Sequence, residues 1–136
     1  MKAFIGVLFN TDIIFNVVKH EGEFKHTGLS IINSLKLNKN KFIADVIRSC
    51  NYECISRVYD NEFVYSKNVK EMSNNINMDS FASFHSMMAV EEEILHFYVY
   101  DVKKDVIYIK TPELNNIVAL EYLNNKDVRE IINKLI

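Results

Sequence analysis

Apolar and polar side chains alternate most regularly between residues 94 and 111, where the sequence reads ILHFYVYDVKKDVIYIKT. Strict alternation is typical of strands with two different faces, and the charged residues in the middle are typical of a turn. A three-residue turn at 103–105 places Tyr100 opposite Tyr108, whereas a two-residue turn pairs Tyr100 with Ile107. Because the hydrophobic pattern sets the register wherever one face is buried, we favour the three-residue turn.

This register gathers the polar aromatic side chains of the hairpin on one face. The candidate contact face consists of Tyr98, Tyr100, Tyr108, His96 and Lys110. Helices cover such a face by default in a domain of this size. It can instead contact another protein or a second copy of the chain, since tyrosine supplies rigid amphipathic area. Base stacking is the third possibility, and the lack of a basic groove counts against it.

The remaining pattern predicts a sequence of strand pairs and helices. We expect hairpins near residues 3–19, 52–66 and 94–111, the second of them turning at Asp60-Asn61. Helices are expected near residues 28–37, 41–49, 80–90, 112–123 and 127–136, with residues 38–40 breaking the first from the second. A short helix over residues 13–19 is the alternative to a strand there, and residues 67–79 are expected to form a loop.

Capping residues mark the other expected helix starts, namely Thr27, Asn40, Asp79 or Ser80, and Asp127. The clearest start is Thr111-Pro112-Glu113, with proline at the first helical position and an acid in the first turn. The fold class is therefore α+β, a single domain over residues 1–136 with a mainly antiparallel sheet.

Composition excludes several classes of protein. Sixteen basic and 18 acidic residues give a formal net charge of −2, which argues against a nucleic-acid or polybasic membrane-surface protein. No apolar run approaches the roughly 18–20 residues that span a bilayer. Two cysteines, Cys50 and Cys54, are too few for a disulfide scaffold, so we expect a cytoplasmic protein with free thiols. The abundance of Asn, Ile and Lys fits an AT-rich coding genome.

The scarcity of glycine excludes phosphate-binding loops. Only three glycines are present, and neither GxGxxG nor GxxxxGK[ST] occurs anywhere in the chain. Such loops need glycine because the backbone must approach the phosphate closely. We therefore expect no nucleotide and no other cofactor.

One segment has the residue types of a metal site. In HEGEFKH, the side chains of His20, Glu23 and His26 could converge if the segment forms a tight loop. Imidazole and carboxylate bind zinc or iron well, but a solvated polar connection between two elements is the simpler interpretation.

An acidic run, Glu91, Glu92 and Glu93, precedes the main hairpin and could meet a basic partner, although such runs are usually solvated. We therefore expect a small non-catalytic protein-interaction module, by analogy of type with immunity proteins, antitoxins and phage-borne inhibitors. Its partner would be another protein, or a second copy in a homodimer. The alternative is a small metal-dependent or acid–base enzyme that uses the His20–Glu23–His26 segment or His96.

Overall fold

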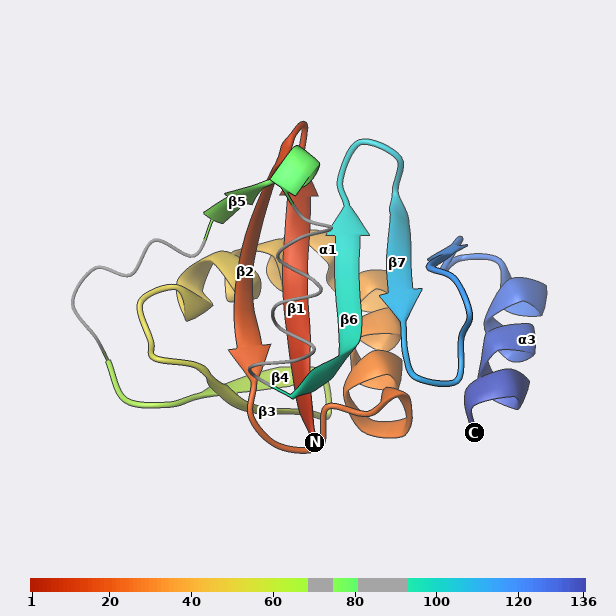
Figure 1. Ribbon diagram of the computed structural model, residues 1–136, viewed down its shortest axis with the longest axis horizontal. Helices are drawn as coiled ribbons and strands as arrows, with labels where there is room; N and C mark the ends of the chain where they lie inside the picture. The colour runs from red at the N-terminus through yellow and green to blue at the C-terminus, as the bar shows by residue number, and fades with distance from the viewer. Residues whose placement is uncertain (69–74, 81–92) are drawn as a thin grey trace.

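The protein is built on one mixed β-sheet. A computed structural model describes residues 1–68, 75–80 and 93–136 (Figure 1). The strands among them are β1 (Lys2–Phe9), β2 (Asp12–Val18), β3 (Ile55–Tyr59), β4 (Glu62–Tyr65), β5 (Asn75–Asn77), β6 (Ile94–Asp101), β7 (Val106–Lys110) and β8 (Val118–Leu120). The helices are α1 (Leu29–Ser49) and α3 (Asn125–Leu135). The α+β class is confirmed.

The sheet is mixed, so the expected mainly antiparallel arrangement is wrong. Its strand order is β4-β3-β2-β1-β6-β7-β8, with β5 also paired to β2. The three predicted hairpins β1–β2, β3–β4 and β6–β7 are antiparallel, and β2 is a strand rather than a helix. However, β1 pairs with β6 in parallel, and so does β2 with β3. These parallel pairs join strands that are distant in the sequence, and no local pattern reveals them.

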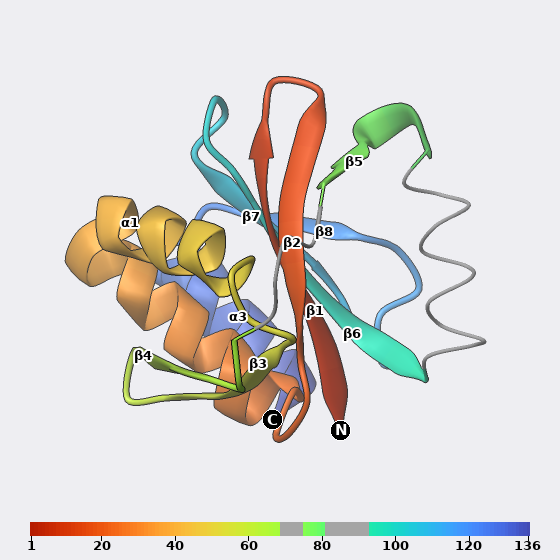
Figure 2. The same ribbon diagram turned by 90° about the vertical axis from the view of Figure 1, so that its left-hand side faces the viewer.

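Both faces of the central strands are buried. Helices α1 and α3 lie on the same side of the sheet (Figure 2). The larger core cluster is formed by residues including Ile5, Val7, Phe42, Tyr98, Tyr100, Ile107 and Ile109. A second cluster of residues that alternate with these holds Phe4, Leu8, Ile13, Ile94, Phe97 and Val99. A sheet that is apolar on both faces reads as nearly continuous hydrophobic runs.

This double burial explains why the predicted register of the β6–β7 hairpin is wrong. Tyr100 lies opposite Ile107 and Val99 opposite Tyr108, one position away from the expected pairing. The connection includes Asp105 at a φ of 55°, and Asp101 Oδ1 accepts a hydrogen bond of 3.0 Å from the Lys104 amide. With apolar side chains required on both faces, the pattern alone does not select the register.

The two helices predicted at 28–37 and 41–49 form one helix with a kink. Asn38 has φ −164° and ψ 93°, and its side-chain oxygen accepts a hydrogen bond of 3.1 Å from the Lys41 amide. The break is therefore at the predicted place, but Asn38, not Asn40, caps the second half. At the start of α1, Thr27 is not the cap. It lies within a π-helical turn, Phe24–Gly28, and its hydroxyl donates a hydrogen bond of 2.6 Å to Glu21 O.

The helix predicted at 112–123 is absent. Leu114 N–H bonds back to Thr111 O, so Thr111-Pro112 opens a turn, and residues Val118–Leu120 form β8 on the edge of β7. Proline suits the second position of a turn as well as the first position of a helix. The edge of β7 favours the turn over the helix, because the pairing of β8 with β7 is accompanied by burial of Leu120 and Tyr122 in the core.

The last predicted helix is α3, whose N-cap, Asn124, precedes the expected cap Asp127 by three residues. The Asn124 side chain accepts hydrogen bonds from the amides of Lys126 and Asp127. Part of the predicted loop 67–79 is strand β5, and the predicted helix at 80–90 falls almost entirely outside the described residues. Among the helices described, none combines the length and the apolar character needed to cross a membrane.

Candidate functional site

The predicted contact face is divided between the two faces of the sheet. His96, Tyr98 and Tyr100 point to the side of α1 and α3 and are buried. Tyr108 packs against the second cluster, and Lys110 lies opposite Phe97. The structure therefore brings three of the five side chains together and covers them.

The buried tyrosines are held by hydrogen bonds to the protein. Tyr98 donates to Gly22 O at 2.8 Å, and Tyr100 donates to Asp105 Oδ1. Burial raises the pKa of both phenols, and in Tyr100 the hydrogen bond to Asp105 adds to the effect. Both remain neutral donors that fix the hairpin against the loop before α1 and the β6–β7 turn.

The other two members of the predicted face also have partners within the chain. Tyr108 donates to Asp101 Oδ2 at 3.0 Å, and the ammonium of Lys110 donates to the carbonyls of Thr111 and Leu114. Of the acidic run, Glu91 and Glu92 lie outside the described residues, while Glu93 is exposed at a φ of 57°.

The metal candidates do not form a ligand set here. His26 Nε2 lies 3.6 Å from Glu23 Oε1, and His20 is exposed at the end of β2. Within residues 1–68, 75–80 and 93–136, no three His, Cys, Asp or Glu side chains are close enough to hold a metal ion.

The cysteines are also placed for packing. Burial raises the pKa of the Cys50 thiol at the end of α1, and the Cys50 sulfur lies 3.7 Å from the carbonyl oxygen of Phe15. Cys54 is buried. A raised pKa lowers the fraction of reactive thiolate at Cys50.

A pocket of about 720 Å³ lies where the loop before α1 meets the start of β6, and we call it the His96 pocket. The imidazole of His96 lines it, together with the carboxylates of Glu23 and Glu113 and the ammonium of Lys25. Its apolar wall consists of Phe24, Leu95, Pro112 and Leu135. The pocket thus unites His96 and Glu23, which the sequence had assigned to separate candidate sites.

His96 is the buried polar group of this pocket. It is 3% exposed, and its Nδ1 has no hydrogen-bond partner among the residues that the structure describes. Burial lowers the pKa of His96, although the nearby charges of Glu113 and Glu23 oppose this. The imidazole is therefore neutral at neutral pH, with one donor and one acceptor nitrogen.

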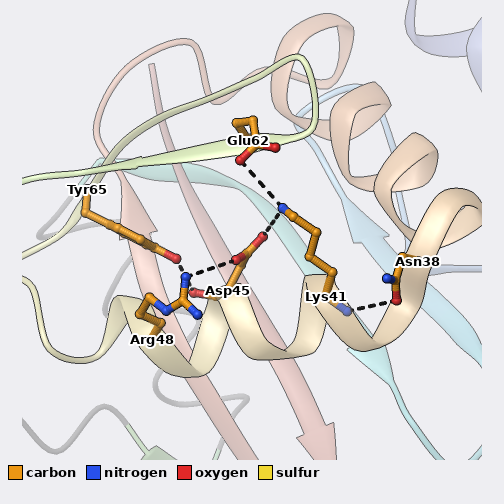
Figure 3. A network of polar contacts seen from close by, with 6 residues as sticks. All are labelled: Asn38, Lys41, Asp45, Arg48, Glu62 and Tyr65. Atoms are coloured by element: carbon orange, nitrogen blue, oxygen red, sulfur yellow. Dashed lines mark hydrogen bonds and ion pairs between the residues drawn. The ribbon is translucent and has the colours of Figure 1, made fainter.

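A smaller pocket of about 180 Å³ lies beside the kink of α1, and we call it the Asp45 pocket. Asp45 accepts a hydrogen bond of 2.8 Å from Lys41 Nζ, which also lies 3.6 Å from Glu62 Oε2 in β4 (Figure 3). Tyr65 donates to the backbone oxygen of Asp45 at 2.8 Å, and Arg48 Nη1 lies 4.0 Å from Asp45 Oδ1. This network attaches the β3–β4 hairpin to α1.

The electrostatics of the network follow from its geometry. The hydrogen bond to Asp45 raises the pKa of Lys41, and burial followed by the charge of Asp45 raises the pKa of Tyr65 to about 12. Ser34, which is 8% exposed, lines the same pocket, and its Oγ has no hydrogen-bond partner in the described part of the chain. In this pocket the charged groups Asp45 and Glu62 are already paired with Lys41, whereas the buried hydroxyl of Ser34 can still form hydrogen bonds.

A third pocket of about 260 Å³ connects these two, and we call it the Tyr59 pocket. It shares Asp60 with the Asp45 pocket and Lys25 with the His96 pocket. We refer to the residues that line these three pockets as the pocket surface. It runs from the kink of α1 past the tip of the β3–β4 hairpin to the start of β6.

Large exposed apolar side chains line the pocket surface. Leu37 is 75% exposed in the Asp45 pocket, and Tyr59 is 62% exposed in the Tyr59 pocket. Leu95 and Met1 are exposed in the His96 pocket. Single exposed apolar residues are normal, but several of them around adjoining pockets are typical of a binding surface.

Most of this surface has no signal in the sequence. The local pattern marks Asp60 only as a turn residue and Glu113 only as the start of a helix, and it places Ser34 and Leu37 in a helix without distinguishing them. The one local signal of a binding surface is Leu37, an apolar residue on the otherwise polar, exposed side of its helix. The rest depends on loops that meet only in the folded chain.

Comparison with protein-family models, with curated proteins and with solved structures gives no match.

Proposed function

We propose that the protein is a non-catalytic module that binds another protein through the pocket surface. The observation that carries this proposal is the alignment of Leu37, Tyr59 and Leu95, all exposed, along adjoining pockets. Interfaces combine apolar and aromatic anchors with a polar rim, and the charged residues of the three pockets supply such a rim. A partner bound in this way can also be inhibited by it.

Site-specific photocrosslinking in cells of the native source tests the proposal. A photoreactive phenylalanine at position 59 should form a covalent adduct with one defined protein. The control carries the same group in place of Leu123, which is 65% exposed and lies outside the three pockets. An adduct at position 59 alone supports the proposal, and its mass distinguishes a different protein from a second copy. Equal adducts at both positions, or none at either, contradict it.

A second candidate function is acid–base catalysis, which the neutral imidazole of His96 in the His96 pocket favours. Neutral histidine can accept a proton from a bound substrate, and Glu113 and Glu23 would stabilise the resulting imidazolium. Incubation of the protein with a metabolite extract tests this candidate. The extract is then compared by mass spectrometry. A metabolite that the wild type consumes and His96→Gln does not would favour the catalytic function, whereas identical mass spectra for both proteins would exclude this role for His96.

A further inference from the structure

The pocket surface is acidic although the chain as a whole is nearly neutral. The carboxylates that line its three pockets are Glu21, Glu23, Asp45, Asp60, Glu62 and Glu113. The lysines that line them are Lys25 and Lys41, and the α-amino group of Met1 lies near His96. Six carboxylates against two lysines contrast with 18 acidic and 16 basic residues in the whole chain. The acidic residues are therefore concentrated here.

Several of these charges remain incompletely neutralised. Asp45 has two cations nearby, Lys41 and Arg48, whereas Glu62 shares Lys41 with Asp45 at the longer distance of 3.6 Å. Glu23 lies beside His26, which neutralises it only when the imidazole is protonated. The neutral His96 adds no positive charge to the His96 pocket. A partner that brings positive charge to this surface would gain electrostatic energy, and that energy grows as the pockets lose water.

Two buried polar atoms independently indicate a ligand. Ser34 lines the Asp45 pocket and His96 lines the His96 pocket, and within residues 1–68, 75–80 and 93–136 neither Ser34 Oγ nor His96 Nδ1 has a hydrogen-bond partner. Buried polar atoms are nearly always hydrogen-bonded, so each exception needs an explanation. A bound group that donates hydrogen bonds in these two pockets would lower the free-energy cost of the unpaired polar atoms. Lysine, with three N–H donors, and arginine, with five, are such groups.

The apolar residues in the walls of the pockets indicate that the ligand also has apolar parts. Leu37, Tyr59 and Leu95 offer apolar contacts between the charged groups. Lysine and arginine carry aliphatic stems that pack on such surfaces while their charged heads reach carboxylates. The excess of acidic residues ends beyond Leu95, because the next pocket along the surface is lined by two lysines, Lys2 and Lys19, and one acid, Glu93.

We infer that the pocket surface binds a basic amphipathic segment of the partner protein, an inference that rests on the protein-binding role proposed above. One lysine or arginine of that segment enters the His96 pocket between Glu23 and Glu113. A second enters the Asp45 pocket, and apolar residues of the segment contact Tyr59 and Leu95. A nucleic acid is excluded as the occupant by the sign of the charge on this surface.

A labelled peptide of alternating lysine and leucine residues, acetylated and amidated at its ends, is the probe for this inference. Fluorescence anisotropy should show binding to the wild-type protein that weakens as salt is added. The variant Glu23→Gln/Glu113→Gln should bind about tenfold more weakly, because two ion pairs are lost. A peptide with glutamate in place of lysine should not bind.

The control variant removes the same number of charges elsewhere. Glu53 and Glu121 are exposed and lie outside the three pockets, so Glu53→Gln/Glu121→Gln should bind the lysine peptide like the wild type. Equal losses in the two variants would show that only the overall charge matters and would overturn the inference. Absence of binding to the wild type, or equal binding of the glutamate peptide, would also overturn it. Thermal unfolding of each variant confirms that it is folded.

The photocrosslink at position 59 separates this inference from the proposed function. If Glu23→Gln/Glu113→Gln loses the crosslinked partner and the control variant keeps it, both stand. If the partner is captured equally by both variants, the protein-binding role stands and the basic segment is wrong. If no partner is captured by the wild type, the proposed function fails, and the inference that rests on it fails too.

Discussion

Tyr122 donates a hydrogen bond of 2.7 Å to Asp105 Oδ1, and this contact joins the segment after β8 to the turn between β6 and β7. Tyr100 donates to the same oxygen from within β6. Hydrogen bonds from Tyr100 and then Tyr122 lower the pKa of Asp105, because they stabilise its charged form. One carboxylate thus connects three separate parts of the chain in a corner of the core.

Replacing this carboxylate should destabilise the protein in a pH-dependent way. Because the pKa of Asp105 is lower in the folded state, its contribution is complete above the ordinary value of 3.8 and disappears as the pH falls through the lowered value. We expect Asp105→Asn to lose about 1.5–3 kcal/mol at neutral pH. Asparagine tolerates the φ of 55° at this position, so backbone strain is not added.

Urea unfolding at pH values above and well below 3.8 measures this effect. The difference between the wild type and Asp105→Asn should shrink at the lower pH. The exposed Asp79 provides the control, and Asp79→Asn should unfold like the wild type at both values. A constant difference across the pH range would show that the charge of Asp105 is irrelevant.

Asn16 should be essential for the end of α1. It lies in β2, is buried, and its Nδ2 donates to the Ser49 carbonyl at 2.8 Å. The last carbonyls of a helix have no partner within the helix. We expect Asn16→Ala to lose about 1–3 kcal/mol of stability in denaturant titrations. Asn33→Ala, on the exposed side of α1, should cost nothing, and equal losses at both sites would contradict the proposed role.

The β3–β4 turn should accept glycine at its second position. Asp60 and Asn61 have φ values of 47° and 65°, as in a two-residue turn in which glycine is favoured second. We expect Asn61→Gly to stabilise the protein by up to about 1 kcal/mol and Asn61→Val to destabilise it by about 1–2 kcal/mol. Thermal unfolding of the two variants measures both effects, and the opposite order of stability would show that the turn has another conformation.

Gly22 should not tolerate a side chain. A Cβ there would lie 2.7 Å from the carbonyl carbon of Lys2 and 2.8 Å from the amide nitrogen of Ala3, both in the backbone of β1. We expect Gly22→Ala to cost about 1–3 kcal/mol in urea unfolding, since a strand must move. Lys19→Ala, at an exposed position before the same loop, serves as control. An unchanged midpoint for Gly22→Ala would show that the loop relaxes freely.

The sequence by itself determined the parts of the fold that depend on neighbours along the chain. A short apolar run defined β1, β-branched residues defined β2, and alternating side chains defined the hairpin β6–β7. The turn residues Asp60-Asn61 joined β3 to β4. Asn38 marked the break in α1, because its side chain competes locally for a backbone amide. These signals are local, so their physical cause is contained in a few consecutive residues.

Tertiary structure alone decided the parallel pairing of β1 with β6, the register of β6–β7 and the choice of strand over helix at Val118–Leu120. Each depends on which segment lies alongside, and the energy gained by burial on both faces outweighs a capping signal such as Thr111-Pro112. The pocket surface belongs to the same class. Glu23, Asp60 and His96 line adjoining pockets only because the fold brings distant segments of the chain together.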